Sequence, residues 1–221
     1  MIRNAALTLA IIISAPLAFA ADQTWDAAVQ KAWQARDLVP ATVETKTEIF
    51  DGGGDKLEVV DTVERLDGWN GGEPVMKKEE KRTTIKKSGV KFELGLGINA
   101  NPLVSAHDGR VATTRKGTES LDGRSCAVYT FEERPEDPKG KPHVGEVWID
   151  SASGAAVKIV SRYKETPKNV SAYELTTRYE LADGLWTPTS AHMDAAGGFL
   201  FFHRTIKVEK TFRGWMRRPQ T

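Results

Sequence analysis

The feature that most constrains the fold is a stretch of alternating apolar and polar residues from Val144 to Met193. A polar break divides it in two, and each half contains a turn signal, a Ser-Gly at 153–154 and an Asp-Gly at 183–184. Successive side chains of a strand point to opposite faces, so this pattern predicts four consecutive antiparallel strands. Each would have one apolar face and one solvated face.

The same alternation continues over most of the chain after Pro40 and predicts eleven strands in all. Asp-Gly pairs at 51–52, 67–68, 108–109, 122–123 and 183–184, and an Asn-Gly at 70–71, supply the positive φ angles that tight hairpins require. Strands joined by such short turns exclude a parallel α/β sheet. The predicted strands are Thr42–Phe50, Lys56–Leu66, Val75–Lys87, Val90–Leu94, Arg110–Lys116, Cys126–Arg134, Val144–Asp150, Ala155–Lys164, Val170–Leu181, Leu185–Asp194 and Phe199–Phe212.

Two segments are expected to be helical. In the first, Thr24–Asp37, Trp25, Val29 and Trp33 lie at helical spacing and form one apolar stripe, with Thr24 as the expected N-cap. The second begins at Asn101, where Pro102 suits the first position of a short helix. If both helices cover the same face of the sheet, they should lie close together. The predicted class is therefore α+β, mainly antiparallel β.

The first twenty residues are interpreted as a signal peptide and set apart from the fold. Arg3 provides a positive start, an apolar run follows, and Ala18-Phe19-Ala20 matches a small-residue cleavage site. An uncleaved membrane anchor is the alternative. Residues 21–221 are expected to form a single domain. The only cysteine, Cys126, excludes an intramolecular disulfide and is expected to be a small buried apolar residue.

The charge balance argues against a nucleic-acid partner. The chain carries 31 Lys and Arg residues against 30 Asp and Glu residues, which leaves no basic excess for phosphate binding. Two segments are locally basic, Lys77–Lys87 and Arg213–Arg218. Solvated strand edges explain them more simply than docking patches.

Motifs for catalysis or cofactor binding are weak, and we expect neither enzymatic activity nor a cofactor or metal. Gly95, Gly97 and Ala100 superficially match a dinucleotide fingerprint but lack the parallel βαβ context. His192 and Asp194 should share a strand face, and His203 could lie opposite them across a hairpin. Solvent-facing polar residues are the simpler interpretation of that cluster.

The alternation also assigns a set of large apolar residues to one face of the sheet. Some of them must form ordinary core beneath the helices, but two short helices are too small to cover eleven strands. We therefore expect a cavity for an apolar ligand on this face. Its predicted lining residues are Tyr129, Phe131, Ile159, Tyr163, Leu175, Tyr179, Met193, Phe202, Ile206 and Val208.

Three segments of the sequence resemble a known family. They read LDGRSCAVYTFE from Leu121, GEVWIDSASGAAVK from Gly145 and YELADGLWTPTSAHM from Tyr179. With the leading helix and the mid-chain Asn-Pro-Leu insert, they are similar to the periplasmic LolA/LolB-like lipoprotein-carrier superfamily, which includes outer-membrane lipoprotein-sorting proteins and RseB-type stress sensors. The resemblance implies an unclosed half β-barrel whose concave face, covered by helices, receives acyl chains.

The resemblance leads to two functional hypotheses. The first is a monomeric periplasmic binder or carrier of lipids or lipidated proteins, with a possible inner- or outer-membrane protein as partner. The alternative is a periplasmic sensor of the RseB type, which would detect lipidated or misfolded outer-membrane components through a protein partner. The absence of a cysteine at the cleavage site fits a soluble species better than a lipid-anchored receptor.

Overall fold

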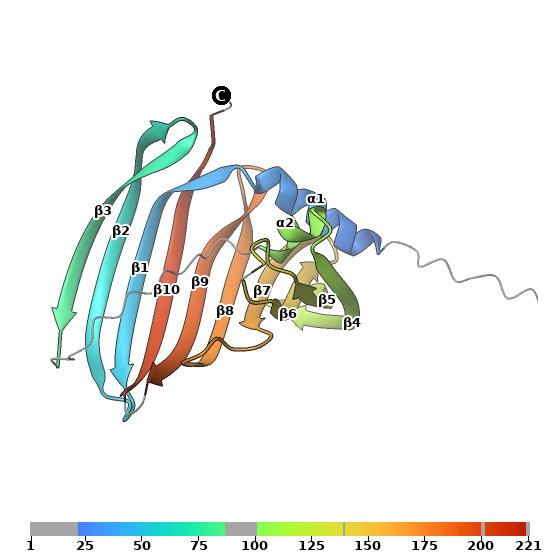
Figure 1. The fold of residues 1–221 in the computed structure, drawn as a ribbon. Coiled ribbons are helices and arrows are strands. Elements are labelled where there is room, and N and C mark those ends of the chain that lie inside the picture. Colours follow the sequence, from blue (N-terminus) through green and yellow to red (C-terminus); the bar gives the residue numbers. More distant parts are fainter. Residues whose placement is uncertain (1–21, 87–100, 139, 200–201, 220–221) are drawn as a thin grey trace, which may run out of the picture.

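In the part of the chain that the structure describes, a single antiparallel sheet carries two helices on one face (Figure 1). The computed structural model describes residues 22–86, 101–138, 140–199 and 202–219, without the side chains of Phe199 and Phe202. The elements are α1 Gln23–Ala35, β1 Leu38–Asp51, β2 Lys56–Asn70, β3 Glu73–Thr84, α2 Pro102–His107, β4 Val111–Leu121, β5 Arg124–Glu133, β6 His143–Asp150, β7 Ala155–Tyr163, β8 Val170–Ala182, β9 Leu185–Phe199 and β10 Phe202–Arg217.

The strand order explains how the sheet is built from two blocks. The order is β3-β2-β1-β10-β9-β8-β7-β6-β5-β4, and every neighbouring pair is antiparallel. The first three strands form one edge, and β4 to β10 return as a meander from the other edge. The blocks join where β1 pairs with β10, from Leu38 opposite Arg217 to Asp51 opposite Arg204. Among the described strands the two edges do not pair, so the predicted unclosed antiparallel barrel is confirmed.

Most predicted turns lie where expected. Asp122 and Asp183 have φ near 51° and are each followed by a glycine with positive φ, the backbone that tight hairpins require. The prediction at 67–68 was wrong, because β2 runs through these residues and the register shifts between Leu66 and Gly68. The Asp-Gly pair there forms a bulge inside the strand. The predicted strand Val90–Leu94 lies outside the described residues, as does the Gly95–Ala100 motif.

Helix α1 follows the predicted apolar stripe but begins earlier than expected. Its N-cap is Asp22, whose carboxylate accepts a hydrogen bond from the Thr24 backbone N–H at 3.1 Å. The prediction of Thr24 as the cap was therefore wrong, since Thr24 already lies inside the helix. Trp25 and Val29 are buried on the sheet side, and each such side chain stabilises the packing by about 1.5–3 kcal/mol.

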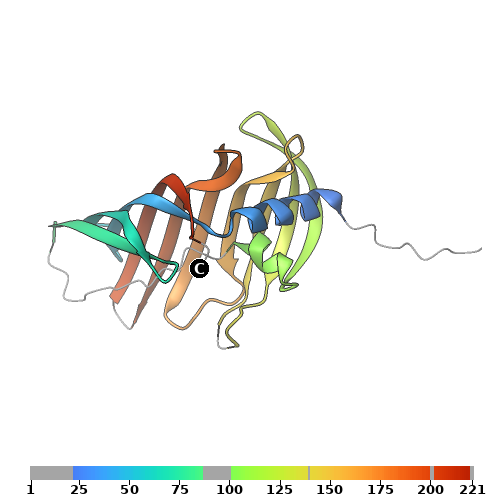
Figure 2. The same cartoon turned by 90° about the horizontal axis from the view of Figure 1, so that it is seen from above.

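Both helices lie on the same, concave face of the curved sheet (Figure 2). Helix α2 is capped by the Asn101 side chain and has Pro102 at its start, as predicted. It contacts α1, β4 and β5, whereas α1 contacts β6, β7 and β9. Trp25, Val29 and Leu103 pack on Tyr129 and Phe131 in one buried cluster. The helices therefore fill the β4–β7 half of the concave face.

The opposite face of β5 to β7 carries a second apolar cluster. Cys126 and Val128 alternate with the helix-facing residues of β5 and pack with Trp148, Val157 and Val160. Cys126 is fully buried, and burial raises the pKa of its thiol. Cys126 is therefore a small apolar packing residue, as predicted.

A test of this packing is the substitution Gly145→Ala. A Cβ at Gly145 would collide with the backbone carbonyl oxygen of Val160 and come within 2.8 Å of the Phe131 ring. Because neither the strand nor the buried ring has room to move, we expect the free energy of unfolding to fall by about 2 kcal/mol or more. Urea denaturation followed by circular dichroism measures this change.

The matched control is Gly68→Ala. A Cβ added at Gly68, which lies on another strand, would meet no atom within 4 Å, so this substitution should change stability by less than about 0.5 kcal/mol. Equal effects of the two substitutions would show that the close packing of β6 on β7 is not a constraint on the fold.

Candidate functional site: a cavity between the helices and the sheet

A cavity of about 380 Å³ lies between the helices and the concave face. This is within the range of small-molecule binding sites. Its residues come from α1, α2, β1, β2 and β7 to β10, and from the segment between α1 and β1. They are Ala28, Lys31, Ala32, Ala35, Arg36, Leu38, Pro40, Val43, Glu64, Asn101, Leu103, Val104, Ala156, Thr177, Tyr179, Trp186, Pro188, Lys210, Phe212 and Trp215.

The cavity exists because the side of α1 that faces it carries small residues. Ala28, Ala32 and Ala35 lie at i, i+4 and i+7, and so on one side of the helix. Their methyl groups reach only a short distance toward the sheet, while Trp25 and Val29 fill the space at the start of the helix. The packing is therefore dense beneath the first half of α1 and hollow beneath its second half.

The sheet side of the cavity is aromatic and apolar. Val43 of β1 pairs with Phe212 of β10 on one side and with Glu64 of β2 on the other, so the three share a face. Phe212 lies 6.1 Å from Trp215, measured between ring centroids. Tyr179 contributes a further ring, and burial raises the pKa of its hydroxyl. These rings offer a large apolar contact surface.

Four ionisable side chains of opposite sign interrupt the apolar lining. Lys31 and Arg36 come from the end of α1, Lys210 from β10, and Glu64 from β2. Lys210 pairs with Thr45, which pairs with Thr62, so Lys210 and Glu64 lie on the same face of the sheet, on the two strands that flank β1. Burial lowers the pKa of the Lys210 ammonium, and the charge of Glu64 partly opposes this shift. Among the described residues, Lys210 has no ion pair within 4.0 Å and no hydrogen bond from its ammonium group.

The structure places the predicted lining residues in three groups. Tyr129, Phe131 and Ile159 are buried directly beneath the helices. Leu175, Met193, Ile206 and Val208 form a separate buried cluster on the same sheet, beside Tyr173. Tyr163 stacks on His143 where β7 ends and β6 begins.

Only Tyr179 of the predicted set lines the cavity. The side chain of Phe202 lies outside the described residues. Whether the other predicted residues contact a ligand stays a prediction. The alternation indicated the face of the sheet, but it held no signal for the part of that face that the helices leave hollow.

The predicted histidine cluster is only partly assembled. His192 and Asp194 form an exposed contact of 2.9 Å between Nε2 and Oδ2. Asp194 pairs with Lys207, whereas His203 pairs with Gly198, which lies four residues further along β9. His203 is therefore remote from the pair. The described part of the chain contains no group of three or more His, Cys, Asp or Glu residues placed to hold a metal ion.

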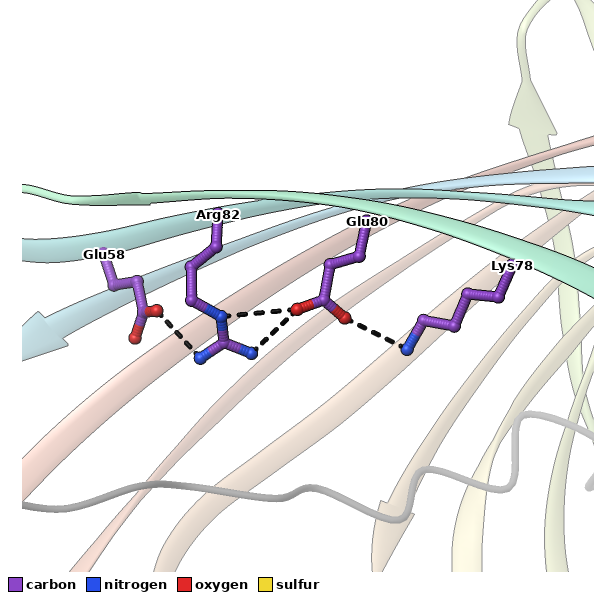
Figure 3. A network of polar contacts seen from close by, with 4 residues as sticks. All are labelled: Glu58, Lys78, Glu80 and Arg82. Atoms are coloured by element: carbon purple, nitrogen blue, oxygen red, sulfur yellow. Dashed lines mark hydrogen bonds and ion pairs between the residues drawn. The ribbon is translucent and has the colours of Figure 1, made fainter.

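Beyond the cavity, the concave face becomes charged toward β3. Glu64 pairs with Lys78, so by alternation Lys78, Glu80 and Arg82 lie on the same face as the cavity. Arg82 contacts Glu58 at 2.8 Å and Glu80 at 3.0 Å, and Glu80 contacts Lys78 at 3.2 Å (Figure 3). Within the basic segment Lys77–Lys87, whose last residue is outside the described residues, these ion pairs involve Lys78 and Arg82.

No protein-family model matches the chain, and no curated protein matches its sequence. Solved structures with a similar fold include a DUF1329 family protein from Desulfovibrio piger, with 15% identity, a TM-score of 0.39 and coverage of 86% of this chain and 91% of the other. A putative outer membrane lipoprotein-sorting protein domain from Vibrio parahaemolyticus has 11% identity, a TM-score of 0.38 and coverage of 89% and 94%. A LolA superfamily protein from Nitrosomonas europaea has 14% identity, a TM-score of 0.37 and the same coverage.

These similarities concern the fold alone. No helix among the described residues is both long and apolar enough to span a membrane.

The partly buried Lys210 predicts a specific dependence of stability on pH. Its pKa in the folded protein lies below the ordinary 10.5, so the unfolded chain binds more protons between the two values. The free energy of unfolding therefore rises as the pH increases through this window toward 10.5. Lys210→Met lacks this contribution, and it should be more stable than the wild type at neutral pH because no desolvated charge remains.

Urea denaturation of both proteins at neutral and alkaline pH tests this prediction. The difference between them isolates Lys210 from Glu64, Lys31, Arg36 and all other titrating groups. A difference that does not shrink as the pH rises would show that the Lys210 ammonium is fully solvated in the folded protein.

Proposed function

We propose that the protein binds the acyl chain of a lipid or lipidated protein in this cavity. The observation that carries the proposal is the hollow between the alanine side of α1 and the aromatic side chains of β8, β9 and β10. Each CH₂ group moved there from water contributes about 0.8 kcal/mol. A mostly apolar lining suits a flexible chain without strong shape selection.

Binding and release require movement of a lid, and α1 is built for this role. Its first half is anchored by buried Trp25, Ala28 and Val29, and Trp25 lies 5.4 Å from Tyr129 between ring centroids. Its second half is only partly buried. It contacts α2 through Trp33, which stacks on His107 with 3.7 Å between the ring centroids. The end with fewer buried contacts opens at lower cost, and this end lies over the cavity.

The remaining predicted residues belong to the same proposal. A long chain would extend from the cavity along the concave face, where Leu175, Met193, Ile206 and Val208 form an apolar strip on β8, β9 and β10. Tyr179 of the cavity lies on β8, the same strand as Leu175. We propose this direction as the path of a chain too long for 380 Å³.

A cavity-blocking variant tests acyl-chain binding. Ala35→Phe places a ring in the cavity at the least buried end of α1 and should lower the affinity for a fluorescent fatty-acid probe at least about ten-fold. The matched control is Gln34→Phe, which adds the same side chain at an exposed position of α1 that does not line the cavity. Its affinity should equal that of the wild type.

Native mass spectrometry of protein purified without detergent gives the second measurement. Co-purifying lipid or acylated peptide in the wild type and in Gln34→Phe, but not in Ala35→Phe, supports the proposal. Equal probe binding in all three proteins would refute the cavity as the site. An empty cavity together with a stably co-purified protein would favour the alternative, an RseB-type sensor.

We also propose that the protein is exported and acts in the periplasm after cleavage before Ala21. The proposal rests on the signal-peptide pattern of residues 1–20, which lie outside the described residues. The intact mass of protein recovered from the periplasm should correspond to a chain that begins at Ala21. A mass that retains these residues would favour the uncleaved anchor.

A further inference from the structure

We infer that the cavity selects a single-chain amphiphile with an anionic head group, and that Lys210 binds this head group. This inference rests on the proposed function, because it names the chemical class of the ligand in the same cavity. The observation behind it is a partly buried ammonium group that lines an apolar cavity without an ion pair among the described residues.

The neighbours of Lys210 do not require a charged side chain at this position. Its neighbours on the two adjacent strands are Thr45 and Ala191, and the next inward-facing residue of β10 is the buried Val208. A leucine or methionine would pack against these residues and avoid the cost of desolvating a charge. Lysine is rarely withdrawn from water without a partner, so a ligand of opposite charge is the partner that this position lacks.

The charges around the cavity favour an anion over a cation. Among its lining residues, Lys31, Arg36 and Lys210 are basic and Glu64 is the single acid. Arg36 also contacts Asp37 at 3.4 Å and is exposed. Lys210 is only partly exposed, so an interaction with its charge is less screened than one with Arg36. Glu64 competes with an anionic ligand for that charge.

The arrangement of the lining residues gives the ligand a direction. Lys210 and Glu64 lie toward the β2–β10 end, beside the charged residues Lys78, Glu80 and Arg82 of β3. The opposite end of the cavity is apolar and is formed by Leu103 and Val104 of α2 and by Ala156 of β7. The head group would lie at the first end and the chain would extend toward the second, where a longer chain would turn along β8 toward Leu175.

The test compares ligands that share one chain and differ only in head group. Isothermal titration calorimetry with lauric acid, dodecyl phosphate, dodecanol and dodecylamine on the intact protein measures the head-group preference. We expect the two anions to bind at least about ten-fold more tightly than dodecanol, because each gains one hydrogen bond to a charged group. Dodecylamine should bind most weakly. The ratio of laurate to dodecyl phosphate distinguishes a free fatty acid from a lipid phosphate as the source.

Two substitutions assign the effect to Lys210. Lys210→Met should lower the affinity for laurate about ten-fold and leave that for dodecanol unchanged. Glu64→Gln keeps the size of the side chain and removes the competing charge, so it should tighten laurate binding. A purely structural role for Lys210 would alter the binding of all four ligands alike.

The outcomes separate this inference from the proposed function. If laurate and dodecanol bind equally and Lys210→Met changes neither, acyl-chain binding stands and the head-group assignment is overturned. Tightest binding of dodecylamine would also overturn it and would assign the head group to Glu64. If none of the four ligands binds, the proposed function fails, and the inference fails with it.

Discussion

The structure depends on a mismatch between the area of its sheet and the size of its helical cover. A ten-stranded sheet presents a concave face much larger than helices of 13 and 6 residues can bury. The chain concentrates its large apolar helix residues at the start of α1, over β5 and β6, and leaves alanines toward its end. Dense packing at one end anchors α1, and the unfilled volume at the other end is the candidate site.

The mismatch also explains how polar groups come to lie on the concave face. Under the helices this face is apolar, and at β2 and β3 it is charged. The charged residues there pair with one another within β3 and between β2 and β3. Between the two regions lies Lys210, which has no ion pair among the described residues. The transition from apolar to charged surface therefore falls within the cavity, as an amphiphilic ligand requires.

Much of the fold follows from local pattern. Alternation along β6 to β9 predicted strands close to those observed, and Asn101-Pro102 predicted the start of α2. The errors arose where tertiary structure decides between equal local signals. Asp67-Gly68 has the composition of a turn but forms a bulge, because β2 continues to pair with β3 on both sides of it. Asp22 and Thr24 are both good caps, and only the position of the first helical turn selects Asp22.

The site was less predictable than the fold for a physical reason. Alternation tells which side chains share a face, and it correctly placed Tyr179 and Tyr129 on the concave face. A cavity forms where side chains are too short to fill the space between two elements, here at Ala28, Ala32 and Ala35. In the sequence these alanines read only as good helix formers. Lys210 likewise reads as a solvated strand residue until β1, β2 and α1 are placed around it.

The pairing of β1 with β10 has a consequence for the order in which the chain folds. Each strand from β4 to β9 pairs with the strand that follows it in the sequence, so this meander closes only short stretches of chain and forms early at low entropic cost. The β1–β3 block has no place in the sheet until β10, the last strand, is available, because Leu38 pairs with Arg217. During synthesis from the N-terminus, β1 to β3 are made first but cannot join the sheet until β10 has been made. During that interval β1 presents an unpaired edge to other chains, so a holding chaperone would act on the N-terminal block rather than on the meander.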